Sequence, residues 1–244
     1  MIHSNQLTTQ LNLCKLPQSE RYSLPFDCYW DESIFAQERK SIFARQWIGL
    51  GRADRLKTPG EYETFEFCGQ ALLLVRDQHN ALRLYANTCR HRGAKLLKAS
   101  GQCQAISCPF HGWTYALDGG LIGRPTAQID KFDPENFSLI EYSLEKANGF
   151  LFAFLGSDEP PKLETQLAGF AKLHQPWSLG DLVTTRRQVF EVNCNWKAFL
   201  DVFNEYYHLN NVHPTSIGNI YLKPEVQDKT IGEYASQFGR TSGT

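Results

Sequence analysis

The spacing of apolar residues changes along the chain and separates a helical stretch from a β-rich one. In residues 31–47, DESIFAQERKSIFARQW, apolar pairs recur at Ile34/Phe35 and Ile42/Phe43 behind a candidate helix cap at Asp31. From Trp47 onwards the apolar runs become short and are separated by turn-forming sequences such as TPGE, DQHN and LDGG. This pattern predicts a helical N-terminal segment followed by a compact antiparallel β domain over roughly residues 47–155.

The predicted strands of this domain are WIGLG, YETFEF, ALLLVRD, LRLYAN and, later in the chain, GFLFAFLG. The last run is the length of a strand and far shorter than a membrane span. SDEPPKLE, residues 157–164, predicts a linker, after which RQVFEVN predicts another strand and a helix is expected from Trp196. We therefore expect three parts: residues 1–46, 47–155 and 156–244.

Charge and cysteine content narrow the classes of function. The 25 Lys and Arg residues balance the 26 Asp and Glu residues, so the chain has no net field for nucleic acid or a membrane surface. The first twenty residues lack the basic and apolar regions of a secretory signal. Seven cysteines is an odd number, which favours a reducing, cytoplasmic location where clustered thiols bind metal or act chemically.

The strongest chemical signal is the run CRHRGAKLLKASGQCQAISCPFHGWTY inside the β domain. Cys89 and His91 form one C-x-H pair, and Cys108 and His111 form a C-x-x-H pair. A glycine follows each pair, as expected of turn-like loops. Two such loops that face each other would offer two thiolates and two imidazoles to one metal centre.

Two metal centres use this donor set. Structural zinc is bound by two cysteines and two histidines, but its like ligands are usually paired in the chain, as C-x-x-C and H-x-x-x-H. Here each loop supplies one cysteine and one histidine, which favours a Rieske [2Fe–2S] cluster, with two cysteines on one iron and two histidines on the other. Trp113 and Tyr115 either shield such a centre or pack as ordinary strand residues.

These motifs, C-x-H-R-G followed by C-P-x-H-G-W, resemble the Rieske domain of the ring-hydroxylating non-haem iron oxygenases. Rieske proteins of respiratory complexes carry an additional disulfide between the two loops. Ala94 and Phe110 stand where its cysteines would be expected. The resemblance therefore implies a cluster without a disulfide and with a low reduction potential.

A second candidate site lies in FNEYYHLNNVHP, where Glu205 precedes His208 and His213. Two histidines and a carboxylate hold iron in non-haem oxygenases. Residues five apart differ by about 140° on a regular α-helix, so these histidines converge only if the helix ends or loosens between them. From the residues alone, Glu205 is a ligand, a surface acid or a residue that orients His208, one helical turn before it. Asp201 supports the site or is a helix-surface acid.

The chain resembles the same family at this second motif as well. The family's motif there is an acidic residue, any residue, Tyr, His, any four residues and then His. The resemblance implies that His208 and His213 bind a mononuclear iron. It also implies that Glu205 bridges His208 to His111 of a neighbouring subunit in a ring-shaped trimer. The family's third iron ligand is a downstream carboxylate, whereas Glu225, Asp228 and Glu233 have no ligand context.

The resemblance implies an α+β fold: an antiparallel β Rieske [2Fe–2S] domain plus the incomplete start of a helix-grip catalytic domain, on which residues 1–46 pack. It implies an oxygenase whose cofactors are the Rieske cluster and a mononuclear non-haem Fe(II), acting on O2 and an aromatic or amine-type substrate. An NAD(P)H-dependent flavin reductase, with or without a ferredoxin, would supply electrons to a homo-trimer, with or without a β subunit. Aromatic hydrocarbon catabolism is one setting for this chemistry. The alternative is a Rieske ferredoxin-like electron-transfer module with a non-catalytic extension.

Overall fold

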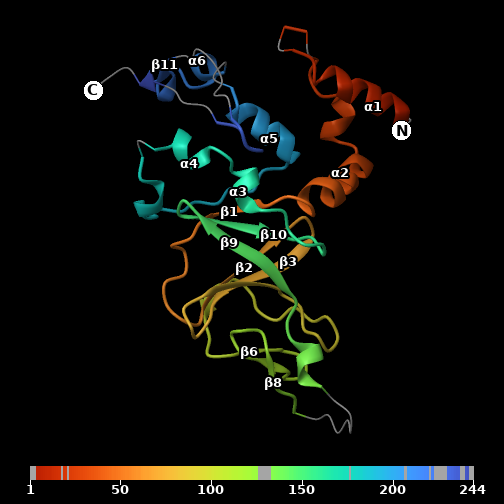
Figure 1. Ribbon diagram of the computed structural model, residues 1–244, viewed down its shortest axis with the longest axis vertical. Helices are drawn as coiled ribbons and strands as arrows, with labels where there is room; N and C mark the ends of the chain where they lie inside the picture. The colour runs from red at the N-terminus through yellow and green to blue at the C-terminus, as the bar shows by residue number, and fades with distance from the viewer. Residues whose placement is uncertain are drawn as a thin grey trace. The chain divides into compact units, whose positions relative to one another are not determined.

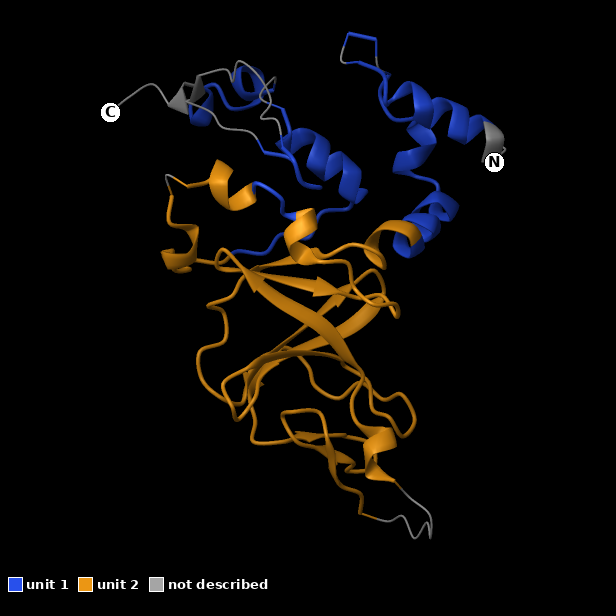
Figure 2. Cartoon of the chain, in the orientation of Figure 1, with its two compact units in different colours: residues 1–40, 167–169, 188–244 blue, residues 41–166, 170–187 orange. Residues whose placement is uncertain are grey.

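The structure is a computed structural model that describes residues 4–17, 19–20, 22–125, 133–175, 177–205, 208–219, 221–222, 230–236 and 240–241. The chain divides into two compact units, coloured separately in Figure 2. Unit 1 consists of residues 1–40, 167–169 and 188–244, and unit 2 consists of residues 41–166 and 170–187. None of the helices in the described ranges has the length and apolar character needed to span a membrane.

Unit 2 is built on a seven-stranded antiparallel sheet with the strand order β1-β10-β9-β4-β3-β2-β5. Its strands are β1 (Ile48–Arg52), β2 (Glu61–Phe67), β3 (Gln70–Arg76), β4 (Leu82–Ala86), β5 (Ser100–Gln102), β9 (Glu141–Ala147) and β10 (Phe150–Phe154). A second sheet joins β6 (Ile106–Ser107), β7 (Thr114–Tyr115) and β8 (Leu121–Gly123). Within the unit this small sheet lies at the opposite end from β1 and β10 (Figure 1).

Strand β3 is buried on both faces, which explains its run of consecutive apolar residues. Leu72 and Leu74 belong to one core cluster, and Leu73 and Val75 belong to another. Successive side chains of a strand point to opposite faces of the sheet, so a strand covered on both sides needs apolar residues at every position. The cluster around Leu73 and Val75 also contains residues of both cysteine–histidine loops, and it thereby anchors them on the sheet.

The five strands predicted before residue 157 are all confirmed, within one or two residues at each end. The pattern missed β9, whose sequence EYSLEKA carries three charged residues and faces the core at only a few positions. The strand predicted at residues 187–193 is wrong: the segment pairs with no described strand, and Val189 and Phe190 are 73% and 72% exposed. An apolar, β-branched run becomes a strand only when a neighbour supplies ladder hydrogen bonds.

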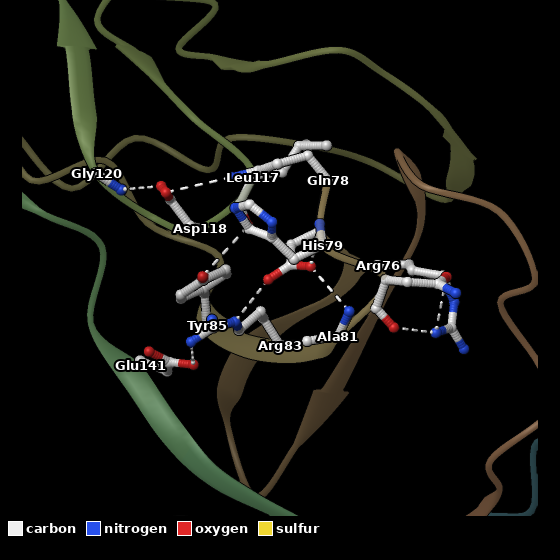
Figure 3. Close-up of polar contacts among 12 residues, drawn as sticks. Arg76, Gln78, His79, Ala81, Arg83, Tyr85, Leu117, Asp118, Gly120 and Glu141 are labelled. Atoms are coloured by element: carbon white, nitrogen blue, oxygen red, sulfur yellow. Dashed lines mark hydrogen bonds and ion pairs between the residues drawn. The ribbon is translucent and has the colours of Figure 1, made fainter.

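The predicted turn DQHN closes the β3–β4 hairpin around a buried carboxylate. Asp77 is fully buried and accepts hydrogen bonds from the N–H groups of His79 at 2.9 Å and Ala81 at 2.8 Å, and from Arg83 Nε at 3.0 Å. Glu141 accepts a hydrogen bond from the same arginine, and Figure 3 shows this pair together with the labelled donor residues His79 and Ala81. Burial raises the pKa of Asp77, but the three donors outweigh it and hold the pKa below its usual value.

The segment that follows the sheet contains α3 (Leu163–Gln166), α4 (Phe170–Leu173) and the short 3-10 helix η4 (Leu179–Asp181). It is tied back to the first strands of unit 2 by polar contacts. Arg52 donates to the carbonyl of Leu179 at 2.7 Å, and Asp54 accepts from the N–H of Thr184 at 2.6 Å. The linker predicted at residues 157–164 therefore leads into a chain that still rests on the β domain.

Unit 1 is mainly helical. It contains α1 (Ser4–Leu13), η1 (Phe26–Tyr29), α2 (Glu32–Glu38), α5 (Trp196–Phe203), α6 (Leu209–Val212), η5 (Ile217–Asn219) and the strand pair β11 (Tyr221–Leu222) and β12 (Arg240–Thr241). The predicted cap is confirmed, because Asp31 accepts a hydrogen bond from the N–H of Ser33 at 2.7 Å. After Glu38 the chain continues as a π-helical turn, η2 (Arg39–Phe43), and Asn195 caps α5 through the N–H of Lys197.

Candidate metal centres

The two cysteine–histidine loops of unit 2 have the same backbone hydrogen bonds. In the first, the N–H of Gly93 donates to Cys89 O at 2.9 Å and the N–H of Cys89 donates to the carbonyl five residues ahead. In the second, the N–H of Gly112 donates to Cys108 O at 3.0 Å, and Cys108 N–H again reaches five residues ahead. Both glycines have positive φ, 73° and 66°, which lets each chain turn so tightly. The two loops are therefore equivalent turns.

The turns bring the four side chains of the two pairs together. Cys89 and Cys108 are each 4% exposed, and the rings of His91 and His111 lie edge to face with centroids 4.9 Å apart. Trp113 stacks on His91 at 4.8 Å with the two planes 5° apart. A buried pair of thiols beside a pair of imidazoles, closed on one side by an indole, is the donor set of a two-metal cluster.

The local electrostatics favour an anionic sulfur at this place. Burial raises the pKa of the Cys108 thiol, but the backbone N–H groups of Phe110 and His111, together with Cys89, outweigh it, so the pKa lies below its usual value. The hydroxyl of Tyr115 lies 3.3 Å from Cys89 Sγ and accepts from the N–H of Arg90, which leaves the hydroxyl proton to point at the sulfur. Thiolate is the form of cysteine that binds metal.

One buried nitrogen at this place has no protein partner: Nδ1 of His111 is shielded from water and makes no hydrogen bond. Leaving a buried polar atom unpaired is costly, so such a nitrogen is suited to bind a metal ion. The residues present therefore fit a [2Fe–2S] cluster. Across the described part of the chain, no three His, Cys, Asp or Glu side chains form a group able to hold one metal ion.

The second candidate site lies in unit 1, just after α5. The helix ends at Phe203, and α6 is a single turn flanked by His208 and His213. A helix does end between the two histidines, at Val212, but it is the short turn α6 and not α5, which ends earlier at Phe203. The two imidazole rings lie with centroids 5.6 Å apart and planes at 72°. On a continuous helix the same residues would point about 140° apart.

Glu205 lies in the connection between α5 and α6, so the prediction that it shares a helix face with His208 is wrong. The contact expected of the pair is nevertheless present. One carboxylate oxygen contacts Nδ1 of His208, and the other accepts from the His208 N–H at 3.2 Å. A carboxylate at Nδ1 fixes the tautomer and leaves Nε2 as the ring nitrogen for a metal.

A cavity of about 320 Å³ adjoins these three side chains and is otherwise lined by Val202, Phe203, Leu209 and Ile217. Its wall is therefore apolar except for the carboxylate and the two imidazoles. Tyr206 and Tyr207 lie outside the described residues. The arrangement suits a metal at the edge of a small, largely apolar pocket.

No third ligand accompanies the two histidines in the described ranges. Glu225 and Asp228 lie outside those ranges, and Glu233 is exposed in an irregular segment. Asp201 accepts a hydrogen bond from the hydroxyl of Tyr29 at 2.6 Å, so its carboxylate supports the packing of α5.

Comparison with known proteins identifies both regions. Residues 46–133 match the model of the Rieske [2Fe–2S] domain, and residues 179–240 match that of the catalytic domain of the ring-hydroxylating alpha subunit. The chain belongs to the Rieske oxygenase alpha subunits. Its α+β architecture, an antiparallel β Rieske domain with part of a catalytic domain, is the architecture of that family. The two domains imply a Rieske cluster and a mononuclear non-haem iron as cofactors.

Individual relatives include enzymes with amine-type and with aromatic substrates. The oxygenase subunit of carnitine monooxygenase from Acinetobacter baumannii is 36% identical over 198 residues, which cover 79% of this chain and 53% of the relative. The crystal structure of the quaternary ammonium Rieske monooxygenase CntA superimposes with a TM-score of 0.82 at 31% identity, covering 90% of this chain and 62% of that one. Chlorobenzene dioxygenase subunit alpha from Cupriavidus is 29% identical over 199 residues. The chain thus spans about half the length of the carnitine relative.

Sequence reasoning left the roles of Trp113 and Tyr115 open and did not consider Glu38. The structure places Trp113 against His91, and Tyr115 against Cys89. The run HGWTY could have indicated both contacts, because Trp113 and Tyr115 follow the turn of the second loop two and four residues after His111. Glu38, which contacts Lys197, is separated from it by 159 residues, and no local pattern links the two.

Proposed function

We propose that the chain acts as the alpha subunit of an oxygenase, with Cys89, His91, Cys108 and His111 holding a Rieske cluster, and His208 and His213 holding a mononuclear iron. When bound, the cluster would supply one-electron transfer and the iron would supply the reduction of O2. One observation carries the proposal: two paired metal-binding arrangements, each with its own supporting contact, occur in one chain.

In each of the two sites, neighbouring groups hold the side chains in the form and orientation that bind metal. The N–H groups around Cys108 favour the thiolate, and Trp113 excludes water from one side of His91. In unit 1 the carboxylate of Glu205 holds the proton of His208 on Nδ1 and keeps the ring oriented. The apolar wall of the adjoining cavity limits the entry of water and suits an organic substrate.

Glu205 is also proposed as the bridge between subunits. A carboxylate has two oxygens, and a head-to-tail ring of identical chains would let it accept a further N–H bond from His111 of the partner subunit. The contact of Glu205 with His208 supports half of this bridge. The structure of a quaternary ammonium Rieske monooxygenase that this chain resembles was described in terms of inter-subunit electron transfer. A homo-trimer, or an assembly with a β subunit, follows as the proposed oligomer.

The proposed substrate is a small amine-type compound, because the chain is similar to the oxygenase subunits of carnitine and glycine betaine monooxygenases. An aromatic compound, oxidised in aromatic hydrocarbon catabolism, is the second choice, supported by the chlorobenzene dioxygenase subunit. The proposed electron donor is an NAD(P)H-dependent flavin reductase, directly or through a ferredoxin. None of the seven cysteines, all of which lie in the described ranges, forms a disulfide, which supports a reducing, cytoplasmic location.

The alternative function is a Rieske ferredoxin-like carrier with a non-catalytic extension. It is favoured by one observation, the lack of a third iron ligand among the described residues. Metal analysis separates the two, because an oxygenase subunit binds about three irons per chain and a carrier about two, counting the two irons of the cluster.

The proposal is tested by electron paramagnetic resonance of the anaerobically reduced protein, which should show a rhombic Rieske signal, and by iron and sulfide analysis. Zinc in place of iron and sulfide would refute it. In the assembled enzyme, Glu205→Gln should slow single-turnover electron transfer while both metals stay bound. Unchanged single-turnover rates would remove the bridging role and leave the cluster assignment intact.

A further inference from the structure

A buried ion pair joins the N-terminal segment to the first turn of α5. The carboxylate of Glu38 lies 2.7 Å from Nζ of Lys197 through one oxygen and accepts the indole N–H of Trp196 at 2.9 Å through the other. The two charged side chains are only 12% and 8% exposed. Burying a charge is costly unless it is paired and hydrogen-bonded, so each partner holds the other in one place.

A second contact lies one turn further along the same helix. The hydroxyl of Tyr29 donates to Asp201 at 2.6 Å, and this hydrogen bond is the main reason that the pKa of Tyr29 rises to about 12. Lys197 and Asp201 are four residues apart and therefore lie on the same face of α5. Two attachment points on one face determine both the rotation of the helix about its axis and its position along that axis.

The other side chains of α5 offer little apolar packing in the described structure. Phe199, Leu200, Val202 and Phe203 are 49%, 45%, 50% and 68% exposed. Among these contacts of the helix in the described part of unit 1, the ion pair of Glu38 with Lys197 is therefore the best buried, whereas the hydrogen bond of Tyr29 with Asp201 is exposed. Glu205 follows two residues after the helix ends, and it contacts His208 directly. A rotation of α5 would move both.

We propose that Glu38 and Tyr29 are positioning residues for the iron site formed by His208 and His213. They act through α5, which they hold at Lys197 and Asp201, and they touch neither the metal nor the substrate. The inference rests on the proposed function, because it assigns a role towards the same site. Metal sites need their ligands held to within about 0.5 Å, which an unattached short helix does not provide.

The test is an anaerobic titration of the cluster-loaded chain with Co(II), followed through its visible ligand-field bands. The proteins are wild type, Glu38→Gln, Glu38→Ala, Tyr29→Phe and His208→Ala. Glu38→Ala should weaken Co(II) binding about tenfold and alter the band energies, as loss of a supporting contact does at other metal sites. Glu38→Gln keeps a hydrogen-bond acceptor for Trp196, so its Co(II) affinity should lie between those of wild type and Glu38→Ala. Tyr29→Phe should weaken Co(II) binding about threefold.

Glu32→Gln is the matched control, since it makes the same change on the same helix at an exposed glutamate. It should leave Co(II) binding within about twofold of wild type. Circular dichroism of the cluster shows that each variant is folded. A purely structural role would lower the melting midpoint and leave the Co(II) spectrum of the folded protein unchanged. If Glu38→Ala does not fold, Tyr29→Phe, which removes one hydroxyl, decides the question.

Wild-type affinity and spectrum in folded Glu38→Gln and Tyr29→Phe would overturn the positioning role. The His208→Ala variant separates this failure from a failure of the proposed function. If His208→Ala abolishes Co(II) binding while the other variants do not affect it, only the positioning role is refuted. If His208→Ala leaves the titration unchanged, the histidine site itself is refuted, and both proposals fail together.

Discussion

The ring of Trp113 lies flat on the ring of His91, with centroids 4.8 Å apart and planes 5° apart. Phe137 contacts the same indole edge to face at 5.6 Å, and the indole is 6% exposed. The histidine that we assign to the cluster is thus held by a buried aromatic stack, in addition to the turn of its own loop. An aromatic pair of this kind contributes about 0.5–1.5 kcal/mol beyond the area that it buries.

Trp113→Ala should therefore destabilise unit 2 by about 3–5 kcal/mol and release the cluster, because it opens a cavity beside His91. Iron and sulfide per chain after gel filtration, and the thermal midpoint, measure the two effects. Trp113→Phe should retain more cluster than the alanine variant. Trp177→Ala, at a half-exposed tryptophan of the same unit, is the control and should change little. Full cluster content in Trp113→Ala would contradict the prediction.

Tyr115→Phe should lower the reduction potential of the cluster. The hydroxyl of Tyr115 lies 3.3 Å from Cys89 Sγ, and a donor at a sulfur ligand stabilises the more negative, reduced state. A loss of about 1 kcal/mol corresponds to roughly 40 mV for a one-electron couple. Redox titration followed by electron paramagnetic resonance measures the potential. An unchanged or higher potential in a variant with full cluster content would show that the hydroxyl does not act on the sulfur.

The two glycines of the loops should differ in their tolerance of alanine. Both have positive φ, so Gly93→Ala and Gly112→Ala each pay the backbone strain of about 1 kcal/mol or more. A Cβ at Gly112 would also lie 3.1 Å from Pro125 Cγ, whereas a Cβ at Gly93 meets nothing within 4 Å. Gly112→Ala should therefore lower the denaturation midpoint and the cluster content more than Gly93→Ala. Equal losses in the two variants would show that the contact with Pro125 relaxes freely.

Asp77→Asn should destabilise unit 2 at neutral pH by about 1–3 kcal/mol, because it removes the charge from three buried hydrogen bonds. The folded-state pKa of Asp77 is depressed below the reference of 3.8, so its charge stabilises the protein above that value. The contribution is lost as the pH falls from about 3.8 through the depressed pKa. Urea denaturation at pH 7 and pH 3 should show the difference between variant and wild type shrink in acid.

Glu141→Gln is the control for this prediction, since it removes the other, exposed partner of Arg83. An exposed ion pair contributes about 1 kcal/mol or less, so this variant should stay close to wild type at both pH values. A destabilisation of Asp77→Asn that is as large at pH 3 as at pH 7 would show that charge is not the cause.

Much of the β domain could be predicted from the sequence, because strand formation there follows local patterns. ALLLVRD predicted β3 through its continuous apolar run, and DQHN predicted the turn that Asp77 closes. The run EYSLEKA was not predicted as a strand, because its charged residues interrupt the apolar pattern. Its place in the sheet depends on pairing with β4 and β10, which are distant or later in the chain. The strand predicted for RQVFEVN is wrong for the opposite reason: the run has the composition of a strand, but no described strand pairs with it.

The residues of the two candidate sites could also be predicted from the sequence. Cys89 and His91, like Glu205 and His208, are two or three residues apart, so a turn of known type brings each pair together. The end of a helix between His208 and His213 was expected as well, and α6 ends there at Val212. The position of Glu205 after α5 was not expected, because a regular helix and a loop allow the same contact with His208.

By itself, the sequence determined the chemistry of this protein: which side chains carry sulfur, imidazole and carboxylate, at which spacing, and on strand or turn. Only the tertiary structure decided which distant residues support them. Trp113 on His91, and Glu38 with Lys197, are contacts across 22 and 159 residues. The physical reason is that turns and caps are fixed by neighbours in the chain. A buried stack or ion pair is fixed by the free energy of packing whole elements together, which no short window of sequence contains.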